Sequence, residues 1–274
     1  MDRFAGRVVL VTGASSGIGA AVAREFARQG ADLVLAARRL SRLLELADEL
    51  RRAGRQALAV SCDVTEDRAV EGAVEQALAA FGRLDVAVAN AGFGVLGPFE
   101  RLGLDDYRRQ FETNVFGVLR TASATLPALR QSRGMLVIVG SVSGHVPTPG
   151  TSAYAMSKAA VHALAGVLRA EVRPYGVGVV LVTPGFVESE IRRVDNRGVY
   201  HADARDPVPR WLVMPADRGA RVIVRAVARR RREVVVTVHG KVVVWLARHF
   251  PSLLAYAVER GPSRSRATPV GESR

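Results

Sequence analysis

Cysteine, lysine and aromatic residues are scarce in this 274-residue chain, and each scarcity narrows what the protein can be. The only cysteine is Cys62, so no disulfide can form within the chain, which indicates a reducing compartment. No uninterrupted apolar stretch reaches the roughly 18–20 residues that a membrane span needs. The first residues, MDRFAGRVVLVTG, enter an expected strand too early for a secretory signal. These absences predict a cytoplasmic protein.

Positive charge exceeds negative charge by a wide margin. The 39 Lys and Arg residues oppose 26 Asp and Glu, for a formal net charge of +13. Such an excess is typical of proteins that bind nucleic acid or an anionic membrane. The arginines, however, are scattered along expected helices and loops. No recognisable nucleic-acid module accompanies them, and aromatic residues make up only 6% of the chain. We therefore expect no nucleic-acid partner, and binding of nucleic acid by the basic surface is only an alternative function.

Short apolar runs alternate with longer helical patterns along most of the chain. Strands are expected at 7–13, 31–38, 56–64, 84–92, 134–144 and 176–185, with a candidate seventh at 233–238. The strands are joined by expected helices, one of them over 104–126. Strands that are apolar on both faces and joined in this way require a parallel sheet covered on both sides. The pattern predicts an α/β protein with a doubly wound Rossmann-type fold, in which a central, mostly parallel seven-stranded sheet is flanked by helices. A single domain is expected over 1–240, followed by an amphipathic extension over 241–260 and a polar, disordered tail over 261–274.

A glycine-rich turn follows the first strand. The sequence TGASSGIG (12–19) places three glycines where that strand passes into an amphipathic helix. Such glycines let backbone N–H groups approach a pyrophosphate, and the helix N-terminus adds partial positive charge. This context predicts a dinucleotide-binding loop, with a plain tight turn as the alternative. The expected cofactor contacts are Gly13, Ser15, Ser16, Gly17, Ile18 and Gly19.

The end of the second strand indicates which dinucleotide binds. An NAD site needs a carboxylate there for the ribose 2′-hydroxyl, whereas an NADP site needs a cation for the 2′-phosphate. Ala37 stands where the acid would be, and Arg38 and Arg39 follow it. Guanidinium groups suit a phosphate, so NADP(H) is favoured over NAD(H). The alternative is that both arginines are ordinary surface charge.

Two further strand ends carry candidate cofactor contacts. Asp63, next to Val64, ends the third strand and is placed to accept a hydrogen bond from the adenine amino group. The fourth strand ends in Asn90, Ala91 and Gly92, a small turn that lets the cofactor pass close. Each of these segments also fits simple turn chemistry.

Together these residues resemble the classical short-chain dehydrogenases/reductases over residues 5–240. The matching motifs, in order, are TGASSGIG, ANAG (89–92), Asn114 in ETNVFG, Ser141 in GSVSG, YAMSK (154–158) and TPG (183–185). The glycine spacing TG-x-x-x-G-x-G is similar to the classical branch and not to the extended branch. Two mild departures, Ala89 where the family often has Asn and Ser189 where Thr is usual, remove no catalytic group.

Tyr154 and Lys158 stand at i and i+4, so on a helix both side chains share one face. A free phenol has a pKa near 10, and an adjacent ammonium is expected to lower that pKa toward the range of a general acid/base. Lys158 is one of only two lysines in an arginine-rich chain, the other being Lys241. Its three donors are also expected to reach the nicotinamide ribose, for which a guanidinium is less suited. A chance pair on a solvated helix face is the alternative.

Two other residues complete the predicted catalytic set. Ser141 ends the fifth strand, where its hydroxyl can donate to a developing alkoxide. Asn114 lies in the long helix after the fourth strand, and the resemblance implies that it helps to hold a water linking Lys158 to solvent. The set implies hydride transfer between nicotinamide C4 and a carbonyl carbon, with Tyr154 moving the proton on oxygen. The predicted function is an NADP(H)-dependent oxidoreductase acting on a ketone, an aldehyde or a secondary alcohol. The alternative is a non-catalytic NADP-binding scaffold or regulator.

Substrate contacts are expected around the turn after the sixth strand. The resemblance places Pro184, Gly185 and the backbone of Val187 beside the nicotinamide, and segment 190–215, with aromatic Tyr200 and Trp211, is expected to form a mobile lid. The expected substrate-binding residues are Ser141, His145, Tyr154 and Phe186, and Phe93, Val95 and Val146 are expected to line the same cleft. A loop histidine without a role is the alternative for His145. The remaining histidines (162, 201, 239 and 249) have no metal-ligand spacing, so no metal is predicted.

The C-terminal extension, KVVVWLARHFPSLLAYAVERG (241–261), is predicted to form two amphipathic pieces broken near Pro251. One interpretation is peripheral contact with the inner face of a membrane, helped by the positive charge. The favoured interpretation is packing on its own domain or on a partner subunit, in a homodimer or homotetramer.

Overall fold

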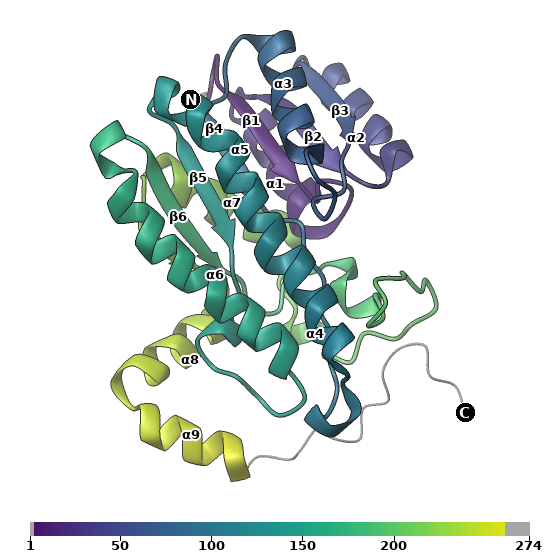
Figure 1. The fold of residues 1–274 in the computed structure, drawn as a ribbon, viewed down its shortest axis with the longest axis vertical. Coiled ribbons are helices and arrows are strands. Elements are labelled where there is room, and N and C mark those ends of the chain that lie inside the picture. Colours follow the sequence, from purple (N-terminus) through teal and green to yellow (C-terminus); the bar gives the residue numbers. More distant parts are fainter. Residues whose placement is uncertain (1–2, 261–274) are drawn as a thin grey trace.

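A seven-stranded parallel sheet organises the protein, which a computed structural model describes over residues 3–260 (Figure 1). The strands are β1 (Val8–Thr12), β2 (Asp32–Ala37), β3 (Ala57–Ser61), β4 (Val86–Ala89), β5 (Met135–Val139), β6 (Gly178–Thr183) and β7 (Glu233–Val235). Their order is β3-β2-β1-β4-β5-β6-β7, and every neighbouring pair is parallel. The predicted fold is therefore confirmed. The predicted tail over 261–274 lies outside the described residues.

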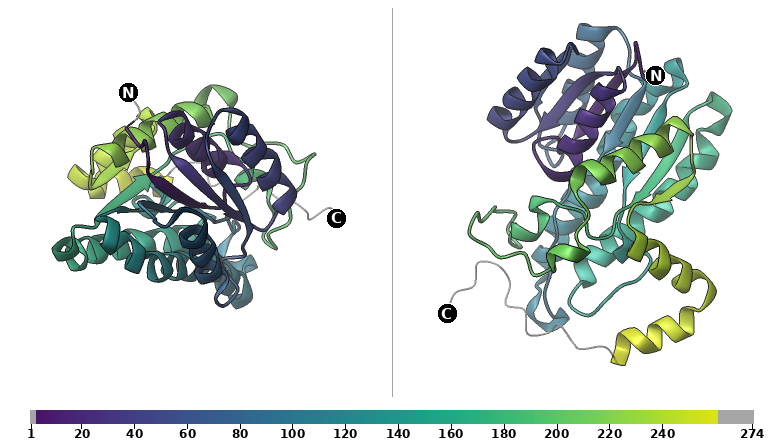
Figure 2. Two further views of the ribbon diagram at one scale, coloured as in Figure 1. Left: turned by 90° about the horizontal axis from the view of Figure 1, so that it is seen from above. Right: turned by 180° about the vertical axis from the view of Figure 1, so that it is seen from behind.

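Helices cover both faces of the sheet (Figure 2). One layer consists of α1 (Gly17–Arg28), α2 (Leu40–Arg52) and α7 (Ala216–Ala228), and the other of α3 (Ala69–Phe81), α5 (Gly117–Ser132) and α6 (Ser152–Glu171). Successive side chains of a strand point to opposite faces, so on β1 Val9 and Val11 pack toward the first layer while Val8 and Leu10 pack toward the second. Because both faces are buried, the strands are apolar throughout rather than alternating.

The order of the strands creates the crevice in which ligands bind. The chain runs outward from β1 to β2 and β3 on one side, then returns to β4 on the other side of β1 and continues to β7. In open α/β sheets, ligands bind outside the carboxyl ends of the strands at such a reversal. The fold thus brings the turns after β1, β2, β4, β5 and β6 to one edge.

The helix expected over 104–126 is not continuous. It consists of α4 (Leu104–Phe111), a π-helical segment (Glu112–Phe116) and the start of α5. A π-helical segment widens one turn of a helix and often occurs at functional sites. Asn114 lies within this segment and is fully buried.

The C-terminal extension consists of two helices, α8 (Val238–His249) and α9 (Pro251–Arg260), so the first begins three residues before 241. Val244 of α8 is buried against the domain, whereas no residue of α9 is buried. In Figures 1 and 2, α9 projects from the lower end of the molecule. Within residues 3–260, the structure has no helix with the length and apolar character that a bilayer crossing needs.

Candidate active site

A cleft of about 570 Å³ lies at the carboxyl edge of the sheet. All of the predicted cofactor contacts line it: Gly13, Ser15, Ser16, Gly17, Ile18, Gly19, Arg38, Arg39, Asp63, Val64, Asn90, Ala91, Gly92, Tyr154, Lys158, Pro184, Gly185 and Val187. Of the predicted catalytic residues, Ser141, Tyr154 and Lys158 line the cleft, and Asn114 is buried behind it. The structure therefore brings together residues that are far apart in the sequence, from Gly13 to Val187.

The glycine loop is shaped by close approaches that a side chain would block. Gly13 has φ +65°, and a Cβ on it would lie 2.8 Å from the Cα of Ala91. A Cβ on Gly19 would lie 2.3 Å from the carbonyl oxygen of Gly13. The loop opens α1 without a side-chain cap from Ser16, so its first N–H groups are available to an anion. This cradle fits the pyrophosphate of a dinucleotide.

Thr12 and Asn90 fix the glycine loop to the neighbouring strand end. The Asn90 side-chain amide donates to the carbonyl oxygens of Thr12 (2.9 Å) and Gly13 (3.2 Å). In return, the Thr12 hydroxyl accepts from the backbone N–H groups of Asn90 (3.0 Å) and Ala91 (3.2 Å). Thr12 was not among the predicted site residues, although it opens the TG motif.

The two arginines after β2 differ in their surroundings. The Arg39 guanidinium donates to the hydroxyls of Ser15 (3.1 Å) and Ser16 (2.9 Å) and pairs with the Glu190 carboxylate at 2.7 Å. The Arg38 side chain is 67% exposed, and its nearest carboxylate oxygen, on Asp63, is 4.0 Å away. Arg39 therefore lies against the glycine loop, where a phosphate on the adenosine ribose would be bound. Glu190 comes from the segment after β6, and no pattern in the sequence predicts that it meets Arg39.

Lys158 is almost fully buried, with 5% of its surface exposed. Its Nζ donates to the carbonyl oxygen of Val139 at 2.9 Å and lies 5.8 Å from the centre of the Tyr154 ring. Burial disfavours the charged ammonium and lowers the pKa of Lys158 to about 8. The ammonium is therefore still largely protonated at neutral pH.

The pKa of Tyr154 corrects one expectation. Burial raises the pKa of this phenol, and the Ser141 hydroxyl and the Arg192 charge oppose that rise only in part. The expectation that Lys158 lowers this pKa is wrong for the structure as it stands, because the ammonium is directed at Val139 and desolvation is the larger effect. A protonated phenol is the form that can give a proton to a nascent alkoxide.

Ser141 and Asn114 are held by backbone groups. The Ser141 Oγ accepts from the Ser143 N–H at 3.1 Å, which leaves its own proton free to be donated. The Asn114 side chain accepts from the Phe93 N–H (3.1 Å) and donates to the Phe93 carbonyl oxygen (3.0 Å). A Cβ on Gly92 would lie 2.9 Å from Asn114 Oδ1 and 3.7 Å from Lys158 Nζ, so this glycine keeps the space between those two side chains open.

Several predicted substrate contacts do not line the cleft. His145 instead forms a 3.0 Å hydrogen bond with Glu233, and Phe186 stacks on His239 with ring centres 5.4 Å apart. Val95 and Val146 are buried in the protein interior. The sequence does not show which way the side chains of the turns point. Phe93 does line the cleft.

The segment over 190–215 covers part of the cleft, but only one of the two aromatic residues expected there contributes to it. Tyr200 lines the cleft, whereas the Trp211 side chain is 83% exposed. The Asn196 side chain bonds both backbone groups of Leu96 (3.0 and 2.9 Å) and so ties the segment to the turn after β4. Lining residues that the sequence does not single out include Arg109, Ile191, Arg192, Val194 and Arg197.

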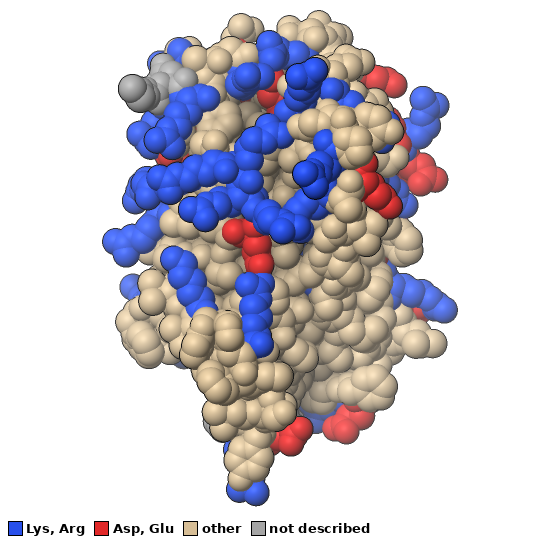
Figure 3. Space-filling view, turned by 90° about the vertical axis from the view of Figure 1, so that its left-hand side faces the viewer, with Lys and Arg blue, Asp and Glu red and all other residues tan. Residues whose placement is uncertain are grey.

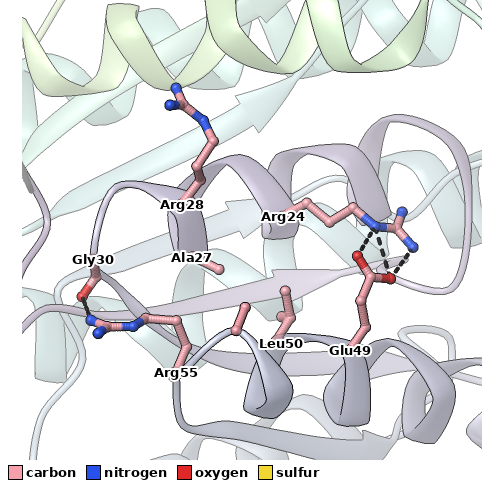
Figure 4. Close-up of a pocket in the computed structure, with 8 residues that line it drawn as sticks. Arg24, Ala27, Arg28, Gly30, Glu49, Leu50 and Arg55 are labelled. Carbon is pink, nitrogen blue, oxygen red and sulfur yellow. Dashed lines mark hydrogen bonds and ion pairs between the residues drawn. The ribbon is translucent and has the colours of Figure 1, made fainter.

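A second cavity, of about 370 Å³, lies between α1 and α2 (Figure 4). Its Arg24 guanidinium is bound by the Glu49 carboxylate, with contacts of 2.7–3.1 Å, and Arg55 donates to the Gly30 carbonyl oxygen at 3.1 Å. None of its lining residues is a predicted site residue. Across residues 3–260, no group of three or more His, Cys, Asp or Glu side chains is arranged to hold a metal ion.

Comparisons with known proteins agree with the geometry of the cleft. A family profile described as short chain dehydrogenase matches residues 7–199. The 11-beta-hydroxysteroid dehydrogenase A of Sesamum indicum is 38% identical over 262 residues, covering 93% of this chain and 75% of that protein.

Solved structures of similar proteins superpose over most of the chain. One is a short chain dehydrogenase/reductase from Burkholderia phymatum in complex with NAD, with a TM-score of 0.82 and 28% identity, covering 92% of this chain and 96% of that one. Another is an alcohol dehydrogenase from the archaeon Thermococcus sibiricus complexed with 5-hydroxy-NADP, with a TM-score of 0.73 and 30% identity, covering 84% of this chain and 95% of that one. One neighbour thus holds NAD and the other an NADP derivative.

Proposed function

The chain belongs to the short-chain dehydrogenase family and is an oxidoreductase of that family, and from this premise we propose that it reduces an apolar ketone or aldehyde with NADPH. The observation that carries the proposal is the position of Ser141, Tyr154 and Lys158 in one cleft with the glycine loop and Arg39. The reverse oxidation of a secondary alcohol uses the same groups. The similarity to a hydroxysteroid dehydrogenase supports an apolar, ring-shaped substrate class.

The roles of the side chains follow from their surroundings. NADPH, when bound, supplies the hydride. The Ser141 hydroxyl donates to the substrate oxygen and orients the carbonyl. Tyr154, whose pKa is raised by burial, then gives its proton to that oxygen as negative charge develops. Lys158 would offer its buried ammonium to the ribose hydroxyls of a bound cofactor, and Asn114 borders the gap through which a water could restore the proton.

We propose that Arg39 sets the preference for NADPH over NADH. We expect Arg39→Ala to raise the KM for NADPH about 10- to 100-fold, because the loss of a charged hydrogen bond costs about 1.5–3 kcal/mol. The KM for NADH should change little, and steady-state kinetics with both cofactors measure the difference. The same measurement on Arg38→Ala, whose side chain is mostly exposed, shows whether the second arginine shares this role. An equal rise in both KM values would contradict the assignment and make Arg39 only a support for the glycine loop.

Glu190 competes with a phosphate for Arg39. Its carboxylate is 2.7 Å from the guanidinium and repels an anion at the same place. Glu190→Gln removes that charge and should lower the KM for NADPH. Because Glu190→Gln leaves the Arg39 side chain in place, this variant tests the effect of charge on NADPH binding without removing the packing of Arg39.

The C-terminal helices present an exposed apolar surface, defined by Val242, Trp245, Phe250, Leu253 and Tyr256. In Figure 3, Lys and Arg gather over the upper part of one face of the molecule, whereas the lower part, where α8 and α9 lie, is mostly uncharged. An anionic bilayer would draw the basic upper part, whereas a second copy would cover the mostly uncharged lower part. We propose that a second copy of the chain covers α8 and α9, in a homodimer or a larger homo-oligomer.

Truncation tests this assembly. A chain ending at His249 lacks α9 and is expected to have a smaller oligomeric mass than the full chain in light scattering coupled to size exclusion. The domain should stay folded, because α9 has no buried residue. Co-sedimentation of the full chain, but not the truncated one, with anionic vesicles, together with an unchanged oligomeric mass, would favour the membrane surface instead.

A further inference from the structure

Two histidines without a predicted role accept hydrogen bonds from the loops that form the active site. His162 Nε2, on α6, accepts from the Ser141 N–H at 3.3 Å. His239 Nε2, on α8, accepts from the Phe186 N–H at 3.2 Å in the turn after β6. Each ring thus fixes the backbone of one loop by the same kind of contact.

A backbone amide can only donate, so each Nε2 must present a lone pair. Each ring is therefore neutral, with its proton on Nδ1. Burial supports this state, because it lowers the pKa of His162 to about 4 and also lowers the pKa of His239. Both histidines hence keep their acceptor at neutral pH.

The chain makes room for the His162 ring with glycines. A Cβ on Gly140 would lie 2.3 Å from His162 Nε2, and a Cβ on Gly144 would lie 2.6 Å from His162 Cε1. These two glycines flank Ser141 in the turn after β5, so the ring packs directly under the catalytic serine. The His145 ring covers it at a centre-to-centre distance of 4.5 Å.

His162 continues the helical spacing of the Tyr154–Lys158 pair on α6. His162 follows Lys158 by four residues, as Lys158 follows Tyr154, so all three share one face of the helix. Three successive turns of α6 thereby place a proton donor, an ammonium and a neutral acceptor along the turn after β5.

We propose that His162 is a positioning residue for the reaction, whose neutral ring holds the Ser141 backbone so that the Ser141 hydroxyl is aimed at the substrate oxygen. The inference rests on the proposed carbonyl reduction. A hydroxyl misplaced by a fraction of an ångström loses much of its effect on the transition state, because catalysis depends on preorganised donors.

Charged and titratable groups surround His162 from four directions. Lys158 lies on the same helix, His145 in the turn after β5, Glu233 on β7 and Arg248 on α8. Only Glu233 favours a charged ring, and its carboxylate is already bound by His145 and Arg248. The surroundings therefore oppose protonation of His162.

Matched variants test the positioning role. His162→Leu fills the space but removes the acceptor, and should lower kcat about 10- to 100-fold with the Kd of NADPH within about twofold of the wild type. His162→Gln keeps an acceptor oxygen and should restore kcat to within about threefold of the wild type. An unchanged kcat in His162→Leu overturns the proposal, and so does an equal loss in His162→Gln.

The state of the ring can be measured without any activity. Long-range ¹H–¹⁵N correlation spectra, assigned by the loss of signals in His162→Gln, should show the neutral Nδ1–H form of His162 from pH 6 to pH 8. A ring protonated on Nε2 in this range overturns the proposal. This outcome is independent of turnover, so failure of the proposed carbonyl reduction would not be mistaken for it.

Discussion

The Tyr154→Phe variant is expected to lose about 10²- to 10⁴-fold in kcat for carbonyl reduction, the usual range for loss of a general acid. The change removes one oxygen and leaves the ring, so the cleft keeps its shape. The phenol is the group whose raised pKa keeps it protonated at neutral pH and whose oxygen lies beside the Ser141 hydroxyl. Steady-state NADPH oxidation with a ketone that the wild type accepts measures the loss.

The matched control for this variant is Tyr200→Phe, which also removes a phenolic oxygen from the cleft lining. It should keep kcat within about threefold of the wild type, because Tyr200 comes from the segment over 190–215 and has no assigned part in proton transfer. NADPH binding by fluorescence should be retained in both variants. A Tyr154→Phe variant with near-normal kcat would remove the phenol from the mechanism.

Lys158→Arg is the second variant expected to be severely impaired, by about 10²-fold or more in kcat/KM. The substitution keeps the positive charge, but Lys158 is almost fully buried and its Nζ donates to Val139 at 2.9 Å. A planar guanidinium is larger and cannot replace a compact ammonium in that space. Lys241→Arg, at the only other lysine in the chain, is the matched exposed control and should leave kcat/KM unchanged. Equal activity of both variants would contradict the assigned role of Lys158.

The pH profile gives this prediction a second readout. Burial places the pKa of Lys158 at about 8, so its ammonium is present below that pH and is lost above it. The kcat/KM for NADPH, which reports on the free enzyme, should therefore fall as the pH rises through about 8. Arginine stays charged throughout this range, so the fall should be absent from the residual activity of Lys158→Arg. A wild-type profile that is flat to pH 10 would show that the charge of Lys158 is not needed.

The fold could be predicted because its determinants are local. Each strand is a short apolar run bounded by turn residues, and the residues of β5, all buried, illustrate why such runs require a sheet covered on both faces. The glycine loop could be located for the same reason: Gly13 must adopt φ +65° and Gly19 must approach a carbonyl oxygen. The π-helical segment at Asn114 could not be predicted, and the backbone bonds of the Asn114 side chain are to Phe93, 21 residues away.

Contacts between distant segments explain most of the other differences. The sequence predicts Arg39 as a phosphate ligand but does not show its pairing with Glu190, which joins positions 151 residues apart. His145 was expected in the substrate cleft and instead meets Glu233, 88 residues later. The pKa of Tyr154 was misjudged because the i, i+4 spacing indicates proximity to Lys158 and says nothing about burial. His162 could have been found, because it continues that same spacing by one further helical turn.

Transfer of deuterium tests the central claim most directly. The protein should be incubated with NADPH carrying deuterium at nicotinamide C4, in separate experiments for each face of the ring, and with steroid, acyl, sugar and xenobiotic ketones. We predict that the wild type converts at least one apolar ketone to an alcohol labelled on the carbinol carbon from one face only, and that Tyr154→Phe binds NADPH but transfers almost no label. Formation of alcohol that is unlabelled in both experiments, or no reduction of any of these carbonyl compounds with either NADPH or NADH, would contradict the account.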